Sequence, residues 1–254
     1  MSLNSLSSSS IKWQRQTISQ KIDTMRIITS LLFLMTMLCS EVAAQVSYSM
    51  ERKNNKYVCE GTANCNYDPK NTFGRAVLWS LDNAYLNKEE KFQPEYNFAN
   101  YALKVRGAFR GNNTDDLYTF TLQIAVEDGK FHYLIDDIRC TPQKGVFAAM
   151  KVVVFDKLNL DKKPQNKVYI DEFNSLCKQY VESVAQSVFC INLVINHWDN
   201  IVRGNVVKGM NPNEVRLAKG KPINISENSQ RVVWSYDSGT VVMFENGAVT
   251  GVVN

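Results

Sequence analysis

The spacing of apolar residues predicts a strand, a helix and then paired strands in the first half of the chain. A first strand is expected in the stretch KYVCEGT, which begins at Lys56. Apolar residues then recur every three or four positions from about Thr72 to Leu86, which is the pattern of an amphipathic helix. In NYALKVRGAFR and YTFTLQIAV the period changes to two, and this alternation predicts two half-buried strands.

The same alternation continues through a predicted hairpin and ends in a long helix. Asp128-Gly129 predicts a type I′ turn, in which both central residues have positive φ. The chain is expected to return as a strand from Phe131, followed by a fourth strand in AMKVVVF at residues 149–155. From about Asp171 to Val202 the three-and-four spacing returns and predicts one long amphipathic helix.

These elements predict an α+β fold, an antiparallel sheet with two helices on one face. The helices need the apolar side of the strands as a packing surface. The other side of the sheet would then be open and polar, and we expect it to be the surface that meets a partner. Its candidate residues are Lys104, Arg106, Thr119, Thr121, Gln123, His132 and Asp136.

The last part of the chain predicts a small module of a short helix followed by a three-stranded meander. Asn211 is a good N-cap, Pro212 suits the first helical position and Glu214 completes a capping box. Gly220 predicts a left-handed end to the helix. Three apolar stretches follow, RVVWSYD, TVVMFE and AVTGVV, and they are separated by predicted turns at Ser238-Gly239 and Asn246-Gly247.

The amino end predicts export. Translation is expected to start at Met25. This residue is followed by a basic residue, by an apolar run from Ile27 to Leu38 and by a cleavage site of small residues before Gln45. The run is shorter than the roughly 20 residues that span a bilayer, so we expect cleavage after Ala44 and no transmembrane span in the mature chain. Lipid attachment at Cys39 is the alternative.

Charge argues against nucleic acid as a partner. Residues 1–44 contain four of the 29 basic and two of the 25 acidic side chains, which leaves the mature chain a net charge of +2. Nucleic-acid binding depends on clustered Lys and Arg, and this chain has no basic run.

Five cysteines follow residue 44, and export would permit disulfides between them. Cys59 and Cys65 enclose only EGTAN, so they are the first candidates for a bond. Cys177 and Cys190 lie on one predicted helix about 20 Å apart, too far for a bond. The odd count leaves at least one thiol free, and buried, unpaired cysteines are equally compatible with the sequence.

No pattern in the chain indicates a catalytic, cofactor or metal site. The predicted strand separates His132 from Asp136 by about 13 Å, too far to chelate one metal ion without other ligands. His197 is expected to be a surface or interface residue of the long helix. The pairs Asp115-Asp116 and Asp136-Asp137 are expected at turns or strand ends rather than as acid/base dyads. Neighbouring strand residues also point to opposite faces, which would keep the two carboxylates of a pair apart.

The stretch from about Lys56 to Arg139, above all FTLQIAVEDGKFHYLIDDI, resembles an exported bacterial domain-of-unknown-function family (family 4468) with a fold like that of TATA-box-binding protein. The tyrosine-rich alternation, the Asp-Gly-Lys turn and the Ile-Asp-Asp-Ile ending carry this resemblance. It implies a TBP-like fold for residues 45–200. It does not imply DNA binding, because one fold serves many functions.

Residues 201–254 are similar to the SmpA/BamE type of outer-membrane assembly lipoprotein. The shared features are Gly209-Met210, Gly220 with Pro222, Trp234 with Tyr236, and Phe244 with Gly247. Members of that family are small scaffolds for proteins and lipids at the inner side of the outer membrane. The resemblance implies a BamE-like helix and meander here.

We therefore expect an exported, non-enzymatic binding or scaffold protein in the periplasm or at the outer-membrane periphery of a Gram-negative bacterium. Its partner would be another envelope protein or an outer-membrane component. The alternative is an enzyme that acts on an envelope polymer through His132 or an aspartate. The sequence does not indicate the oligomeric state.

Overall fold

The computed structural model describes residues 46–85, 92–112, 116–143, 152–160, 162–228 and 231–254. Residues 45–254 form one compact unit. The predicted signal peptide, Asp115 and residues 149–151 of the predicted fourth strand lie outside the described residues. The domain boundary at residue 200 stays a prediction.

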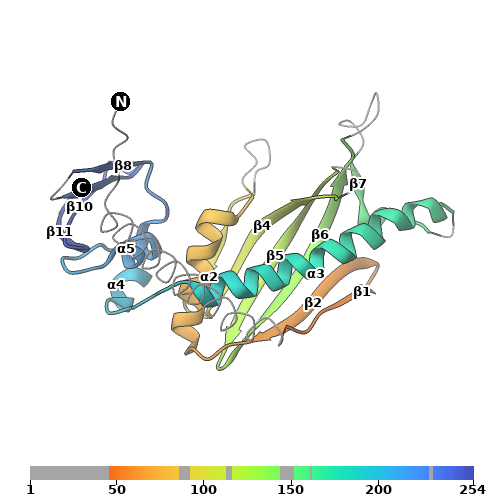
Figure 1. Ribbon diagram of the computed structural model, residues 1–254, viewed down its shortest axis with the longest axis horizontal. Helices are drawn as coiled ribbons and strands as arrows, with labels where there is room; N and C mark the ends of the chain where they lie inside the picture. The colour runs from red at the N-terminus through yellow and green to blue at the C-terminus, as the bar shows by residue number, and fades with distance from the viewer. Residues whose placement is uncertain (1–45, 86–91, 113–115, 144–151, 161, 229–230) are drawn as a thin grey trace, which may run out of the picture. The chain divides into compact units, whose positions relative to one another are not determined.

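The larger sheet is antiparallel and has seven strands (Figure 1). Its order is β1-β2-β6-β5-β4-β3, and β7 pairs with β6. The strands are β1 Ser49–Lys53, β2 Lys56–Asn64, β3 Glu95–Asn97, β4 Ala102–Arg110, β5 Leu117–Glu127, β6 Lys130–Thr141 and β7 Val153–Val154. The predicted α+β class is confirmed, although the two edge strands β1 and β3 were not predicted.

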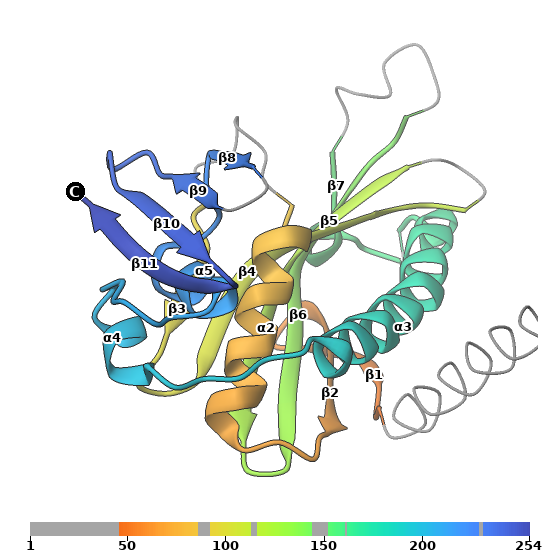
Figure 2. The same cartoon turned by 60° about the vertical axis from the view of Figure 1, so that its left-hand side comes forward.

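Helices α2 (Pro69–Asn83) and α3 (Lys167–Cys190) lie against one face of this sheet (Figure 2). Two short 3-10 helices, η2 Phe155–Lys157 and η3 Pro164–Asn166, precede α3. The capping side chain of Asp68 accepts a hydrogen bond from the N–H of Asn71 at 3.0 Å, which starts α2 at Pro69, earlier than predicted. None of the described helices is both long and apolar enough to cross a membrane.

Aromatic rings fill the interface between α3 and the sheet. Tyr180 of α3 lies 5.1 Å from Phe120 and 5.8 Å from Phe109, measured between ring centroids. Gly107 makes this packing close, because a Cβ at that position would lie 2.3 Å from the Phe120 ring and 2.9 Å from the Tyr180 hydroxyl. The fully buried rings include Phe73, Tyr118, Phe120, Phe131, Phe155 and Phe173.

The prediction of one long helix from Asp171 to Val202 is wrong beyond Cys190. Helix α3 ends there, residues 191–197 run without helical structure, and the short helix α4 covers Trp198–Val202. The buried guanidinium of Arg75 on α2 donates hydrogen bonds to the carbonyls of Phe189 and Ile191 and so satisfies the end of α3. A residue far away in sequence therefore ends the helix.

The small module at the carboxyl end contains helix α5 (Pro212–Lys219) and a four-stranded sheet in the order β11-β10-β9-β8. The capping box between Asn211 and Glu214 is confirmed, and Gly220 has the predicted positive φ, 80°. The three predicted strands are β9 Val232–Ser235, β10 Val241–Glu245 and β11 Ala248–Val253. The meander gains an unpredicted edge strand, β8 Asn224–Glu227.

The predicted tight turns differ in their backbone conformation. Asn246 and Gly247 have φ of 50° and 75°, as a type I′ turn requires. The hairpin at Asp128-Gly129 is confirmed, but only Gly129 has positive φ, so this turn is not type I′. Asn54 and Asn55, with φ of 47° and 63°, form the unpredicted turn between β1 and β2.

Replacing Gly247 with valine should lower the free energy of unfolding by about 1–2 kcal/mol, because a β-branched residue is strained at positive φ. No atom lies within 4 Å of the position its Cβ would take, so backbone strain is the only cost. Chemical denaturation would measure it, with the exposed strand position Thr250→Val as the control. Equal stability of the Gly247→Val protein and the wild type would contradict the turn conformation.

The disulfide predicted between Cys59 and Cys65 does not form. EGTAN continues strand β2 instead of closing a turn. Six residues of strand separate the two Cα atoms by about 20 Å, far beyond the ~7 Å limit for a bond. Both thiols are free and buried, and no disulfide joins Cys177 to Cys190.

Candidate functional site

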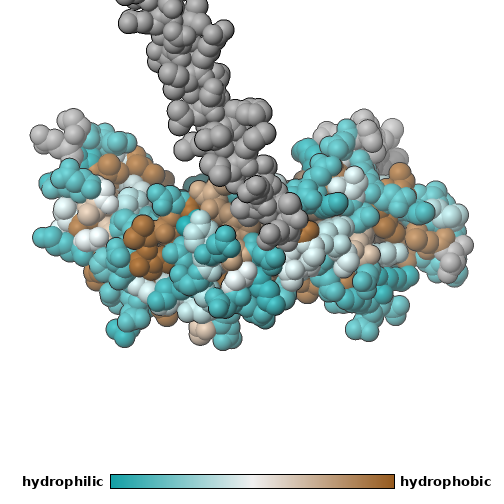
Figure 3. Space-filling model, turned by 60° about the horizontal axis from the view of Figure 1, so that its bottom comes forward, coloured by the Kyte–Doolittle hydropathy of each residue, from teal (hydrophilic) through white to brown (hydrophobic). Residues whose placement is uncertain are grey.

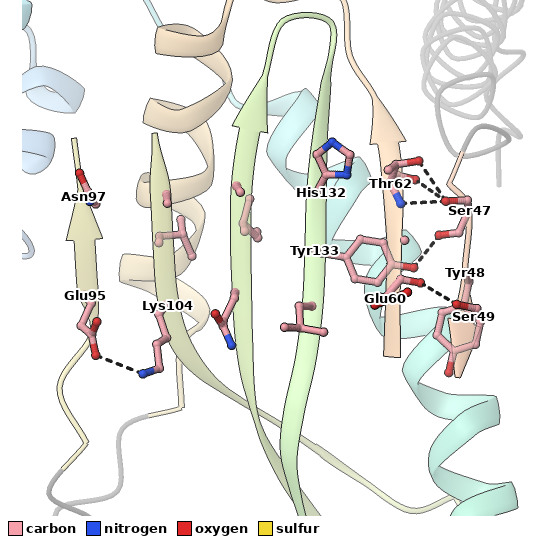
Figure 4. Close-up of a pocket in the computed structure, with 17 residues that line it drawn as sticks. Ser47, Tyr48, Ser49, Glu60, Thr62, Glu95, Asn97, Lys104, His132 and Tyr133 are labelled. Atoms are coloured by element: carbon pink, nitrogen blue, oxygen red, sulfur yellow. Dashed lines mark hydrogen bonds and ion pairs between the residues drawn. The ribbon is translucent and has the colours of Figure 1, made fainter. Parts of the chain in front are cut away.

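The main hollow of the larger sheet is a groove of about 800 Å³ on the face opposite the helices. It crosses β2, β6, β5 and β4, between the edge strand β3 on one side and the edge strand β1 with the residues that precede it on the other (Figure 4). The predicted open, polar face therefore contains a concave surface.

Two rows of side chains cross the groove because the antiparallel register aligns residues on neighbouring strands. Successive positions in a row are paired across β3, β4, β5, β6 and β2. The first row is Asn97, Ala102, Ala125, His132 and Thr62, and the second row is Glu95, Lys104, Gln123, Leu134 and Glu60. The two alanines leave room above the middle of the sheet. A segment of a partner could lie across the strands there.

The carboxylates and the lysine that line the groove each have a partner of opposite charge, and His132 contacts a carboxylate. Lys104 lies 3.3 Å from Glu95, measured from Nζ to Oε1, and Glu60 pairs with Lys53. The Nε2 atom of His132 lies 3.2 Å from a carboxylate oxygen of Glu127. The close contact with His132, together with Lys130, holds the pKa of Glu127 below its usual value. The groove therefore favours uncharged polar groups over a strongly charged ligand.

Hydroxyl groups line the end of the groove at the β1 edge. The Ser47 hydroxyl lies 3.0 Å from that of Thr62, and its oxygen accepts the backbone N–H of Thr62 at 2.8 Å. The Ser49 hydroxyl makes a longer contact with the carbonyl of Glu60, at 3.5 Å. The amide of Gln123 lies on the groove floor, and its only described hydrogen bond is a 3.4 Å contact to Asp136. These groups can exchange hydrogen bonds with a bound polar chain.

Asp136 and Asp137 face the same side of the sheet, which corrects the expectation that they point to opposite faces. Asp137 has a φ of 48°, and the register between β5 and β6 shifts opposite it. This bulge brings Asp137 within 2.8 Å of the Arg106 guanidinium, while Asp136 contacts Gln123. Burial raises the pKa of Asp136; Lys56 and Lys104 oppose the rise, and Asp137 adds to it.

The predicted partner surface divides into half-buried and buried residues. Lys104, Gln123 and His132 line the groove, and Asp136 lies beside it. Thr119, Thr121 and Arg106 are buried. The Arg106 guanidinium lies between Asp137, the Thr121 hydroxyl at 2.9 Å and the ring of Phe92 at 5.3 Å. The side chains of these three residues therefore form part of the buried sheet and not of its accessible surface.

The remaining candidates for chemistry have structural roles. His132 pairs with Glu127 and not with Asp136. Asp116 accepts the backbone N–H of Gln143 at 3.0 Å and so holds a loop. Within the described part of the chain, no group of three or more His, Cys, Asp and Glu side chains could hold a metal ion.

The edge residues of the groove were missed because β1 and β3 were not predicted. Two signals were present for β1: Asn54-Asn55 favours a tight turn, and it stands between the stretches SYSMERK and KYVCEGT. Strand β3 has only three residues, too few to show a period. Glu60 and Thr62 lie on β2, which was predicted without reference to the open face.

Elsewhere the surface offers smaller features. Hydrophobic residues form separate patches among hydrophilic ones in the view of Figure 3. In the small module, a hollow of about 460 Å³ lies beside Trp234 and Phe244, whose rings are 4.7 Å apart. Both rings are buried, as expected of core aromatics.

Comparison with protein-family models and with curated proteins gave no match. Among solved structures, a TBP-like protein from Parabacteroides distasonis is similar, with 12% identity and a TM-score of 0.43 over 56% of this chain and 98% of that chain. A DUF4468 family protein from Bacteroides ovatus is also similar, with 11% identity and a TM-score of 0.42 over 57% of this chain and 94% of that chain. The elements described above, an antiparallel sheet covered by helices on one face, establish the α+β class of this chain.

Proposed function

We propose that this protein is a non-enzymatic binding or scaffold protein of the bacterial cell envelope, and that the groove on the open sheet face is its binding site. The observation that carries the proposal is the groove itself, a hollow of about 800 Å³ that crosses the sheet between the edge strands β3 and β1. Pockets of this size are typical ligand sites. The predicted signal peptide motivates the envelope location.

The lining favours an extended, uncharged polar segment of another envelope protein. Ion pairs already neutralise the charged side chains of the lining, so a charged ligand would have to compete with them. Hydroxyl and amide groups of Ser49, Thr62 and Gln123 are suited to the N–H and C=O groups of a peptide backbone. The resemblance of residues 201–254 to outer-membrane assembly lipoproteins suggests a scaffold setting.

Filling the groove should abolish this binding. Ala125 is an exposed member of the first row, so Ala125→Trp would occupy the groove without disturbing the core. We expect at least a tenfold loss of partner binding with an unchanged melting temperature. The control is Ser183→Trp, at an exposed position on α3 away from the groove.

Site-specific photo-crosslinking in envelope extracts would first identify the partner. A crosslinker at residue 125 should give one discrete product that is absent when the crosslinker is at residue 183. Equal labelling from both positions, or partner binding by the Ala125→Trp protein at wild-type strength, would place the binding surface elsewhere.

The second candidate function is an enzyme that acts on an envelope polymer. The raised pKa of Asp136 beside the groove favours it, because perturbed carboxyl groups occur at active sites. Turnover of peptidoglycan or envelope glycans by the purified protein, lost in Asp136→Asn and retained in the exposed-site control Glu227→Gln, would support the enzyme and contradict the binding protein.

A further inference from the structure

Cys59 and Cys177 lie together in the core between strand β2 and helix α3. Both side chains are completely buried. Cys59 is on the helix-facing side of β2, opposite Ile135 of β6, and Cys177 is on the sheet-facing side of α3, one turn after Phe173. The two thiols are close enough to influence each other's ionisation. The sequence left the cysteine pairing open, and the fold brings together two cysteines that are far apart in the chain.

The hydroxyl of Tyr48 fixes the position of this pair. It lies 3.5 Å from the Cys59 sulfur and 2.7 Å from the Oδ1 atom of Asn174. Asn174 precedes Cys177 by about one helical turn, so the same hydroxyl contacts the strand cysteine and the helix that carries its partner. Tyr48 thereby holds β2 and α3 at the thiol pair.

We propose that Cys59 and Cys177 are a redox site that forms a disulfide between β2 and α3 when the chain folds in an oxidising medium. This inference goes beyond the proposed binding function and does not depend on it. The oxidant is a disulfide, such as glutathione disulfide or a dithiol oxidase in its disulfide form.

The reaction takes place in two exchanges. The Cys59 thiolate attacks one sulfur of the oxidant, forms a mixed disulfide and releases one thiol. The Cys177 thiolate then attacks the Cys59 sulfur, forms the protein disulfide and releases the second thiol. Two cysteine thiols are oxidised, one disulfide is reduced to two thiols, and the two protons from the cysteines pass to the released thiolates.

The environment gives the two cysteines different roles. The neighbouring Cys177 thiol, with a smaller contribution from Tyr48, lowers the pKa of Cys59 against the effect of burial. The neighbouring Cys59 thiol and burial raise the pKa of Cys177. Once β2 and α3 meet during folding, the Cys59 thiol is the more readily ionised of the two and attacks first, and Cys177 is the resolving thiol. Complete burial means that oxidation accompanies folding and does not follow it.

Refolding of the reduced, denatured full chain in a glutathione buffer would test the proposal. After equilibration, the protein is denatured in N-ethylmaleimide and mapped by mass spectrometry. We expect the Cys59 and Cys177 peptides to be linked in most molecules, and Cys65 and Cys140 to be alkylated. The linked protein should melt several degrees above the same protein in dithiothreitol, because a long closed loop restricts the unfolded chain.

Two variants serve as controls. Cys59→Ser should remove the linked peptide and the effect of dithiothreitol on melting, while Cys65→Ser should leave both unchanged. If Cys59→Ser does not fold, the map of the wild-type chain still decides the outcome. Alkylation of both Cys59 and Cys177 after refolding in the most oxidising buffer, or a dominant bond between other cysteines, would overturn the proposal.

Discussion

Replacing Glu214 with glutamine is expected to destabilise the protein by about 3 kcal/mol, because its carboxylate is fully buried and bonded by donors on both oxygens. One oxygen accepts the backbone N–H groups of Asn196 at 2.6 Å and His197 at 2.8 Å. The other accepts the N–H of Asn211 at 2.9 Å. In glutamine, an NH₂ group replaces one of these two oxygens. This NH₂ group would face a backbone N–H, so two donors would point at each other.

Urea denaturation would measure this loss. The matched control is Glu227→Gln, which removes the same charge at an exposed position on β8 and should change stability by less than about 0.5 kcal/mol. Equal stability of the two variants would mean that Glu214 does not hold residues 194–197 against α5.

The same carboxylate should make the protein sensitive to acid. Burial would raise the pKa of Glu214, but the N–H groups of Asn211, Asn196 and His197 outweigh it, and the pKa lies below its usual value. The stabilisation is then complete above the unfolded-state pKa, about 4.3, and is lost as the pH falls through the lower pKa of the folded state. The melting temperature of the wild type should therefore fall below about pH 4.3 as this stabilisation is lost. The Glu214→Gln protein should lack this contribution to the fall.

Replacing Arg75 with methionine is expected to cost about 2–4 kcal/mol, because two carbonyls at the end of α3 would lose their donor in a buried position. The Nη1 atom of Arg75 lies 3.0 Å from the Phe189 carbonyl oxygen, and Nε donates to Asn71 at 2.9 Å. The guanidinium also lies 3.7 Å from the centroid of the Tyr67 ring. Methionine keeps the apolar stem but replaces none of these interactions.

Two measurements would check this prediction. Chemical denaturation gives the loss of stability, with Lys178→Met at an exposed position of α3 as the control. Hydrogen exchange should show faster exchange in the last turn of α3 in Arg75→Met than in the control. Wild-type protection there would mean that α3 ends for a reason other than this guanidinium.

Part of the candidate site was accessible from the alternation of the central strands. Lys104, Gln123 and His132 occupy polar positions of β4, β5 and β6, and they line the groove as the pattern predicts. The same pattern also selected Arg106 and Thr121, which are buried. Periodicity assigns a residue to a face but does not show what covers it. The bulge at Asp137, which supplies the partner of Arg106, has no signature in the alternation.

The sequence by itself determined the elements whose causes are local. The β5–β6 hairpin, the capping box of α5, the positive φ of Gly220 and the Asn246-Gly247 turn each depend on residues within a few positions of one another. For these elements, propensity and hydrogen bonding agree over a short stretch of chain.

Only the tertiary structure decided the features that depend on distant residues. Helix α3 ends at Cys190 because Arg75, more than a hundred positions earlier, supplies donors to its last carbonyls. Cys59 meets Cys177 rather than Cys65 because β2 is extended and α3 packs across it. The groove exists because two short edge strands join the sheet on either side of the hairpin. Contacts of this kind gain their free energy from burial in the assembled core, which no local pattern of residues records.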